Sequence, residues 1–327
     1  MCSVVCLTYN HEAYIAKALD GFVMQRAPFP FEVVIHDDAS TDGTAAIMKH
    51  YEASHPGLFR CVYQTENQYS RRGHVLCNDV VATTTGRYVA LCEGDDRWID
   101  PGKLEKQVAF MEATPGCSMS FHAARIEYAD GSGRSRVHRY PGRRLFEPRE
   151  VILGGGGFYL TCTAMFRRDV FDEYPGFLAG APVGDIMLAL NAISKGTVGY
   201  IDHVMAVYNC GVPGSWTERA RRRSLEESLE FHRKLEEARS AFDEYTSFRY
   251  SAWIKQRRSR NAILLLRACS NDGGCRREFR QLKPTMTWHD RMRFTFGYLY
   301  WRCRGLVLRS VRAADHRTGK GAGPVEP

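Results

Sequence analysis

Acidic and hydroxyl side chains gather where three apolar, β-branched runs of the sequence end. The residues concerned are Thr8, Tyr9, Asn10, Asp37, Asp38, Ser40, Asp42, Glu93, Asp95 and Asp96. Carboxylates of this kind can hold a hard divalent cation that bridges phosphate oxygens, and they can accept hydrogen bonds from hydroxyl and imide groups. Their types and spacing therefore suit a site for a metal ion and a phosphorylated ligand.

The runs that precede these residues predict the strands of an α/β domain. Strands are expected at residues 3–8, 32–37, 59–64 and 88–93. Between the first two, the apolar residues from Ile15 to Val23 recur at helical spacing and predict an amphipathic helix. This alternation is typical of a mostly parallel central sheet flanked by helices. Such sheets bind ligands beyond the carboxyl ends of their strands, which is where the acidic residues lie.

The same pattern continues downstream and then changes near residue 215. Helices are expected at 101–114 and 185–194, and strands at 117–128, 158–168 and 199–208. Beyond Trp216 the sequence is basic and helical, with helices expected at 219–237 and 248–268. We therefore expect an α/β domain at 1–215, a basic C-terminal helical extension at 216–315 and a disordered tail at 316–327.

Composition and charge agree with this division. The chain has 327 residues, 44% of them hydrophobic, which is enough to bury a large core. Residues 1–217 contain 20 Lys and Arg against 24 Asp and Glu, whereas residues 218–327 contain 25 against 13. Because the two parts differ in sign, we expect them to meet different partners.

The sequence shows no run of about 18 uncharged apolar residues and no basic flank followed by an apolar stretch at its start, so a cytoplasmic protein is expected. Segment 288–312 mixes aromatic residues with arginines, as helices at membrane surfaces do. It is expected either to attach the protein peripherally to an anionic inner membrane face or to form a helical cover over the α/β domain. The eleven cysteines lack paired C-x-x-C spacing and are expected to be reduced core residues.

The acidic segments, in this order and spacing, resemble glycosyltransferase family 2, whose members have the GT-A fold and take a sugar from a nucleotide diphosphate donor. Members of that family have a first strand ending in Thr-Tyr-Asn, an Asp-Asp-x-Ser-x-Asp-Gly-Thr turn and a D-x-D-type acidic motif. The corresponding segments here are Thr8-Tyr9-Asn10, Asp37-Asp38-Ala39-Ser40-Thr41-Asp42-Gly43-Thr44 and Glu93-Gly94-Asp95-Asp96. The resemblance extends through Asp100-Pro101-x-Lys103-Leu104 to about Tyr208.

The acidic motif after the fourth strand is expected to hold Mg²⁺ or Mn²⁺, because a divalent cation stabilises a departing diphosphate. We expect Asp96 to ligate the metal, Asp95 to contact the donor ribose or share the metal through water, and Glu93 to be a less favoured extra ligand. The alternative is that the two aspartates cap the helix that begins near Pro101.

The nucleotide is expected at the ends of the first two strands. The expected nucleotide-sugar-binding residues there are Thr8, Tyr9, Asn10, Asp37 and Asp38. A carboxylate can accept from an imide N–H or from sugar hydroxyls, and the resemblance puts Asp38 on the base with Thr8 beside it. The alternative for the second segment is an Asx turn in which Ser40 and Asp42 cap the next helix.

Two further site residues follow from the resemblance. Arg72 matches an arginine that holds the pyrophosphate, although a solvated basic loop is an equal alternative. Asp185 matches the acid that takes the acceptor proton at the start of a helix, and its alternative is a helix cap. The family more often has Glu-Asp where this chain has Gly184-Asp185.

The resemblance implies an inverting transfer of one sugar, favours a uridine diphosphate donor, and implies a surface-polysaccharide or lipid-linked acceptor. One rival is a sugar-nucleotide-binding regulator without turnover, against which Asp95, Asp96 and Asp185 argue. Another rival is a nucleic-acid-binding protein, but no recognised motif is present and the acids would repel phosphates without a metal. Nucleic acid is therefore not expected as a partner.

Overall fold

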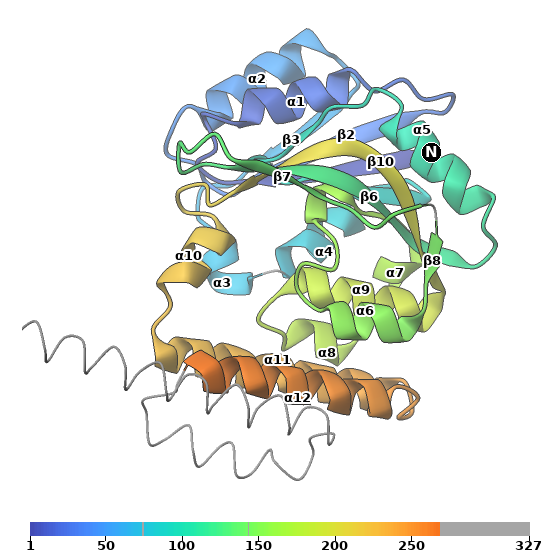
Figure 1. The fold of residues 1–327 in the computed structure, drawn as a ribbon. Coiled ribbons are helices and arrows are strands. Elements are labelled where there is room, and N and C mark those ends of the chain that lie inside the picture. The colour runs from blue at the N-terminus through green and yellow to red at the C-terminus, as the bar shows by residue number, and fades with distance from the viewer. Residues whose placement is uncertain (74, 143, 269–327) are drawn as a thin grey trace, which may run out of the picture. The chain divides into compact units, whose positions relative to one another are not determined.

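The structure is a computed structural model that describes residues 1–73, 75–142 and 144–268, and these residues form a ten-stranded sheet flanked by helices (Figure 1). In sheet order the strands are β3 (Phe59–Tyr63), β2 (Phe31–Asp37), β1 (Cys2–Thr8), β4 (Tyr88–Leu91), β9 (Met165–Arg167), β6 (Cys117–Tyr128), β10 (Thr197–Cys210) and β5 (Arg97–Trp98), with β7 (Ser135–His138) on β6 and β8 (Arg144–Phe146) on β10. The predicted α/β class with a mostly parallel core is confirmed.

The strands β3, β2, β1 and β4 are parallel. In the register of the pairs, Thr8 lies opposite Asp37, and Val5 lies opposite Leu91. Because β1 is hydrogen-bonded on both sides and buried on both faces, it is a continuous apolar run and not an alternating one. The carboxyl ends of β1, β2 and β4 therefore meet at one edge of the sheet, as the sequence predicts.

The second half of the sheet is mixed. β9 runs antiparallel to both β4 and β6, whereas β6 and β10 are parallel. The prediction of one strand at 158–168 is wrong for its first half, where residues Thr161–Thr163 form the 3₁₀-helix η1. This turn is held from outside, because the Trp98 indole N–H donates to the Cys162 carbonyl at 2.9 Å.

Helices cover both faces of the sheet. Helices α1 (Ile15–Val23) and α2 (Thr44–Ser54) lie on one face, and α4 (Val75–Ala82), α6 (Pro148–Gly154) and α9 (Gly184–Lys195) lie on the other (Figure 1). Further helices are α3 (Tyr69–Arg72), α5 (Lys103–Glu112), α7 (Asp169–Asp172), α8 (Gly176–Ala179) and α10 (Trp216–Arg222). As predicted, α1 buries its apolar stripe of Ile15, Ala18, Leu19 and Phe22.

The described chain divides into two compact units. The first is Met1–Ser224 with Arg233–Tyr250, and it contains the sheet; the second is Leu225–His232 with the described residues from Ser251. Helix α11 (Leu225–Tyr245) contributes to both units, and α12 (Ser251–Ala268) belongs to the second.

Several sequence predictions concern the C-terminal part of the chain. Among the described residues, no helix is long and apolar enough to cross a membrane. The predicted membrane-docking segment 288–312 and the tail 316–327 lie outside the described residues. The domain boundary at residue 215 stays a prediction. The described cysteines are free thiols, and five of them are buried: Cys2, Cys6, Cys92, Cys117 and Cys162.

A buried lysine joins α5 to the sheet. The Lys103 side chain is fully buried, with Nζ 3.9 Å from the centroid of the Trp98 ring, and it donates to Gln107 Oε1 at 2.7 Å. Gln107 Nε2 in turn donates to the carbonyl of Thr163 in η1 at 3.0 Å. Burial lowers the pKa of Lys103 to about 8, because the charged amine loses its hydration.

We predict that Lys103→Met changes how stability depends on pH. The pKa of Lys103 is about 8 in the folded state and near 10.5 when unfolded, so the folded protein bears the cost of a buried charge below pH 8 and loses this cost as pH rises to 10.5. Relative to the variant, the wild type should therefore gain on the order of 3 kcal/mol of unfolding free energy across this interval. Urea titrations at several pH values measure the difference.

The control for this experiment is Lys106→Met, which removes an amine that is 43% exposed. Its unfolding free energy should keep a constant difference from wild type over the same interval. If the unfolding free energies of wild type and Lys103→Met changed with pH in parallel, the buried amine would not lose its charge between pH 8 and pH 10.5.

Candidate active site

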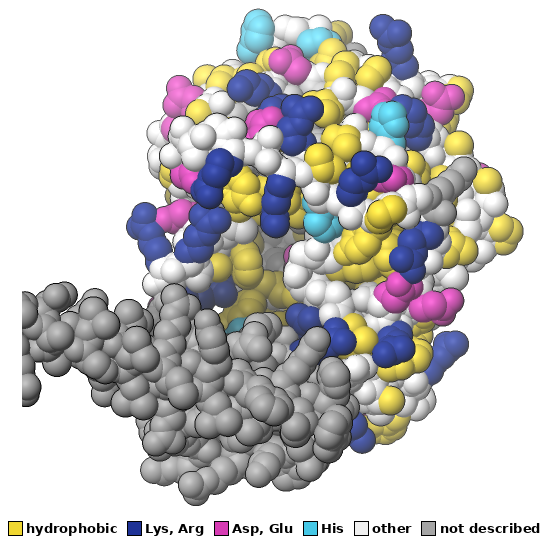
Figure 2. Space-filling view, in the orientation of Figure 1, with side chains coloured by type: hydrophobic (Ala, Val, Ile, Leu, Met, Phe, Trp, Pro, Cys, Tyr) yellow, Lys and Arg dark blue, Asp and Glu magenta, His cyan; other side chains and the backbone are white. Residues whose placement is uncertain are grey.

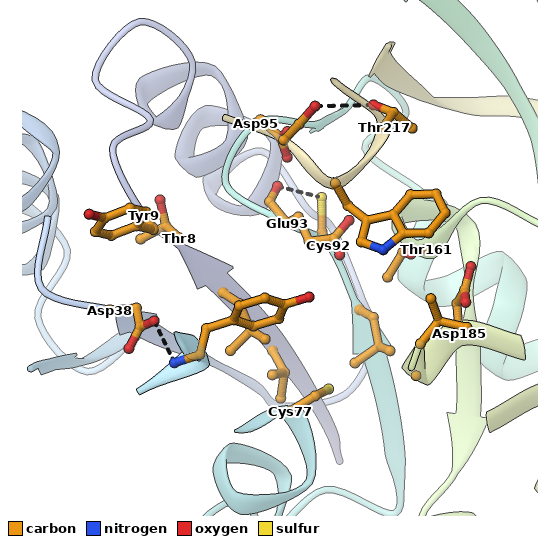
Figure 3. Close-up of a pocket in the computed structure, with 18 of the residues that line it drawn as sticks. Thr8, Tyr9, Asp38, Cys77, Cys92, Glu93, Asp95, Thr161, Asp185 and Thr217 are labelled. Carbon is orange, nitrogen blue, oxygen red and sulfur yellow. Dashed lines mark hydrogen bonds between the residues drawn. The ribbon is translucent and has the colours of Figure 1, made fainter. Parts of the chain in front are cut away.

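A cavity of about 570 Å³ lies beyond the carboxyl ends of β1, β2 and β4, within the usual size range of small-molecule sites. The space-filling view shows a hollow on one face with hydrophobic side chains inside it and Lys and Arg side chains around it (Figure 2). In the close-up, Thr8 and Tyr9 lie on one side, Asp185 lies on the other, and Glu93 and Asp95 lie between them (Figure 3). The site thus brings together residues from β1, the β4 loop and α9.

Asp38 forms part of the cavity wall but its carboxylate is used within the protein. Its Oδ1 accepts from the Gln68 backbone N–H at 2.6 Å and its Oδ2 from the Tyr69 N–H at 2.9 Å. His36 Nε2 lies 3.5 Å from Asp38 Oδ1, and both side chains are buried. Asp38 therefore fixes the start of α3, whose Tyr69 also lines the cavity.

Thr8 and Tyr9 occupy the same end of the cavity. Thr8 is buried, and its Oγ1 lies 3.2 Å from His11 Nδ1. Tyr9 is 43% exposed, so its ring has a free face. His11 Nε2 is 4.0 Å from Asp95 Oδ2, which links this end to the acidic loop. Burial lowers the pKa of His11, although Asp95 acts in the opposite direction.

Asn10, Asp37 and Arg72 are not among the residues that line the cavity. Asn10 Oδ1 accepts from the Thr41 N–H at 2.8 Å, and Asp37 Oδ1 accepts from the Ser40 N–H at 3.2 Å and from its hydroxyl. These contacts fix the turn after β2. Arg72 pairs with Asp79 at 2.9 Å. The predicted donor contacts of these three residues stay predictions.

Glu93, Asp95 and Asp96 form an acidic cluster in which one carboxylate oxygen of each lies within 4.8 Å of the others. Glu93 and Asp95 line the cavity. Asp96 is 1% exposed; its Oδ1 accepts from the Asn209 backbone N–H at 2.8 Å, and its buried Oδ2 has no partner among the described residues. The cluster therefore has both a face toward the cavity and an unsatisfied oxygen behind it.

Loss of hydration raises the pKa of each acid in this cluster, and repulsion by neighbouring acids adds to this for Glu93 and Asp96. The pKa of Glu93 is raised to about 8, first by burial and then by the charges of Asp95 and Asp185. Burial also raises the pKa of Asp95, and burial with the neighbouring acids raises that of Asp96 well above its usual value. Oxygen ligands crowded in this way suit a hard divalent cation, which would offset the repulsion.

Asp185 stands at the beginning of α9, facing the acidic cluster across the cavity (Figure 3). Its Oδ1 accepts from the Ile186 N–H at 2.7 Å, while the Tyr159 hydroxyl donates to its backbone carbonyl at 2.8 Å. The N-terminus of a helix favours the ionised carboxylate. Tyr159 is buried and also lines the cavity, and Trp216 lines it at 40% exposure.

The cavity residues that the sequence analysis did not assign include His11, Tyr69, Thr217 and Arg219. His11 directly follows the strand-end motif Thr8-Tyr9-Asn10, so its position beside Thr8 could have been predicted from the local sequence. Thr217 and Arg219 follow β10, whose parallel pairing with β6 brings its carboxyl end to this edge. Nothing in the sequence near Thr217 and Arg219 indicates that the chain comes back to this edge of the sheet.

Solved structures with a similar fold are GT-A glycosyltransferases. The structure of Staphylococcus aureus TarS in complex with UDP superposes with a TM-score of 0.53 at 20% identity, covering 72% of this chain and 64% of that one. The mannosyltransferase PcManGT of Pyrobaculum calidifontis, in complex with GDP-Man and Mn²⁺, gives 0.50 at 20% identity over 91% of this chain and 84% of that one. At these identities the likeness shows the fold, which is the predicted GT-A fold.

The chain belongs to glycosyltransferase family 2. Residues 3–175, more than half of its length, match the sequence profile of the family described as Glycosyl transferase family 2. The uncharacterized protein Rv1520 of Mycobacterium tuberculosis is 37% identical over 215 residues, 65% of this chain and 60% of that protein. Bacillus subtilis TuaG, named a putative teichuronic acid biosynthesis glycosyltransferase, is 35% identical over 46% of this chain and 58% of its own length. The chain thus matches about 60% of the length of these relatives.

We predict that Glu93→Gln stabilises the ligand-free protein at alkaline pH. The pKa of Glu93 is 4.5 when unfolded and about 8 when folded, so the wild type loses stability as pH rises between these values, whereas the variant does not. With a chelator present, the variant should exceed wild type by about 1–3 kcal/mol near pH 8 and by little near pH 4.5. Denaturant unfolding measures both.

The matched control is Glu66→Gln, because the Glu66 side chain is 67% exposed and pairs with Arg71 at the surface. Its stability should remain within about 0.5 kcal/mol of wild type at each pH. A stability difference for Glu93→Gln that does not grow with pH would contradict the crowding of charge at this site.

Proposed function

We propose that this protein transfers a single sugar, with inversion, from a nucleoside diphosphate donor to a surface-polysaccharide or lipid-linked acceptor. The observation that carries the proposal is the cavity itself, which in a family 2 chain joins Thr8 and Asp38 to the acidic cluster and Asp185. A binding site for such a donor needs a place for the nucleoside, a place for the diphosphate, and a proton-accepting side chain that faces the sugar. The cavity offers these three environments in that order.

The nucleoside would lie against Thr8, Tyr9 and the α3 segment that Asp38 holds. Tyr9 and Tyr69 offer aromatic surface, and Asn67, another cavity residue, offers an amide. Uridine diphosphate is the favoured donor nucleotide. The TarS structures contain UDP or UDP-GlcNAc, whereas PcManGT contains GDP-Man, so the fold accommodates either base.

The acidic cluster fits a divalent cation, Mg²⁺ or Mn²⁺, because its ligands are hard oxygens and Asp96 Oδ2 lacks a partner among the described residues. Asp95 and Asp96 would hold the ion, with Glu93 beside them. When bound, such a cation neutralises charge that develops on the departing diphosphate. The backbone bond from Asn209 orients Asp96 for this role.

We predict that Mn²⁺ alone raises the melting temperature of wild type by several degrees, and that Asp95→Asn and Asp96→Asn abolish this rise. Linkage requires that an ion bound to the native state stabilises it, and each variant removes one anionic ligand. Thermal denaturation with and without Mn²⁺ measures the effect. Asp130→Asn, which removes a carboxylate 46% exposed, should respond as wild type does. An unchanged rise in both cluster variants would rule out this metal site.

Asp185 would accept the proton of the acceptor hydroxyl. Its position at the N-terminus of α9 favours the charged form, and it faces Glu93 across the cavity, where the sugar end of a donor would lie. A base on the side opposite the leaving group is what inversion requires. Its carboxylate and the acidic cluster would thus act on opposite sides of the reacting carbon.

We predict that Asp185→Asn lowers the rate of donor hydrolysis about 10²- to 10⁴-fold while leaving UDP affinity nearly unchanged. Water replaces the unidentified acceptor in this assay, and release of UDP from a panel of UDP-sugars with Mn²⁺ reports turnover. The control is Asp169→Asn, an aspartate at the start of α7 that pairs with Arg167 at 2.7 Å. Equal rates in wild type and Asp185→Asn would remove Asp185 from the mechanism.

Cytoplasmic location and peripheral attachment to an anionic membrane belong to the same proposal. A lipid-linked acceptor would be met at a membrane surface, and residues 218–327 contain 25 Lys and Arg against 13 Asp and Glu. The attachment would use segment 288–312, which lies outside the described residues.

A further inference from the structure

The charges that line the cavity are unbalanced. Four acidic residues line it: Asp38, Glu93, Asp95 and Asp185. Among the described residues that form the wall, Arg219 is the one arginine or lysine. A diphosphate needs positive charge on more than one side, and a cation at the acidic cluster would approach it from one side.

Arg219 has a guanidinium that is available to a ligand. It lies on α10, is exposed, and has its guanidinium carbon 5.5 Å from the centroid of the Tyr69 ring. Among the described residues it takes part in no ion pair. Its neighbours are used differently: Arg221 contacts Cys210 Sγ at 3.5 Å, and Arg222 pairs with Glu218.

The position of Arg219 is between the two ends of the expected donor. Tyr69, beneath its guanidinium, is held by Asp38 at the nucleoside end. Two residues before Arg219, Thr217 points toward Asp95 at the acidic end (Figure 3). A diphosphate that joins a nucleoside on the Tyr69 side to a cation on the Asp95 side therefore passes close to Arg219.

The segment that carries Arg219 is tied to the acidic loop. Asn209, the penultimate residue of β10, donates its backbone N–H to Asp96 Oδ1 at 2.8 Å and its side-chain amide to the Asp95 carbonyl at 2.5 Å. Thr217 Oγ1 accepts from the Gly211 N–H at 3.3 Å, and Ser215 caps α10 by accepting from the Glu218 N–H. These bonds fix where α10 begins relative to the acids.

We infer that Arg219 binds the diphosphate of the nucleotide donor, as a residue supplied by the segment after β10. This inference rests on the proposed function, because it requires a nucleoside diphosphate in the cavity. It gives α10 a direct part in donor binding and adds a positive charge to a cavity wall that carries four acidic residues. Arg72, which resembles a pyrophosphate-binding arginine in sequence, is paired with Asp79 outside the cavity wall.

The test measures the affinity of the full chain for UDP and GDP, each with Mn²⁺, by calorimetry. Two charge-removing variants are compared with wild type: Arg219→Gln and Arg222→Gln. Arg222 is the matched control because it lies on the same short helix and carries the same long-range charge, but it pairs with Glu218. A third variant, Arg219→Lys, keeps the charge and loses the planar donor fork.

The expected result is a loss of about 10- to 100-fold in nucleotide affinity for Arg219→Gln, the range typical of a charged hydrogen bond. Arg219→Lys should lose less, and Arg222→Gln should remain within about two-fold of wild type. Melting temperatures of the ligand-free variants, recorded in parallel, should match wild type, because Arg219 has no ion pair to lose among the described residues.

Two results overturn the inference. If wild type binds a nucleotide and Arg219→Gln binds it equally well, or if Arg222→Gln loses as much, Arg219 is not the diphosphate contact and the proposed function stands. If wild type binds neither UDP nor GDP, the proposed donor site itself is wrong, and the role of Arg219 fails with it.

Discussion

Three carboxylates held within 4.8 Å of one another constrain the structure around the end of β4. Burial and like charge disfavour their ionised forms, so the surrounding protein must keep them together against repulsion. It does so through the backbone. The Cys92 N–H donates to the Val5 carbonyl at 3.1 Å and the Gly94 N–H to the Leu7 carbonyl at 2.9 Å, so that the pairing with β1 continues past the end of β4. Backbone hydrogen bonds to the buried strand β1 thus hold the carboxylates in place against their repulsion.

The same pairing brings the Thr8 end and the acidic end of the cavity together. Gly94 packs so closely on β1 that a Cβ atom there would lie 2.5 Å from Thr8 Oγ1 and 3.0 Å from His11 Nδ1. A side chain at this position would force the acidic loop away from the end of β1. Glycine between Glu93 and Asp95 therefore serves to shorten the distance between two functional strand ends.

The sequence predicts a residue of this site only where a local sequence pattern determines the position of that residue. Thr8 ends β1, Asp38 directly follows β2 and Asp95 lies in the loop after β4. Parallel pairing must bring such positions to one edge, so the local pattern is sufficient to predict them. Asn209 and Arg219 reach the site because β10 pairs with β6 in the distant half of the sheet. That pairing depends on tertiary packing, and no spacing in the sequence reports it. The break of the expected strand at η1 has a similar cause, since Trp98 holds it from another segment.

A motif rich in acids also does not reveal which acids face a ligand. The turn after β2 exposes several backbone N–H groups that need acceptors, and its aspartates supply them: Asp42 accepts from the N–H groups of Thr44 and Glu12, and Asp37 from that of Ser40. Asp38 does the same for α3. Because three carboxylates are used to hold loops, the end of the cavity proposed for the nucleoside is already ordered, and little ordering entropy remains to be lost on binding. In the proposed function, the charge that meets the donor directly is then concentrated at the β4 loop, where the acids are crowded and their ionised forms are disfavoured.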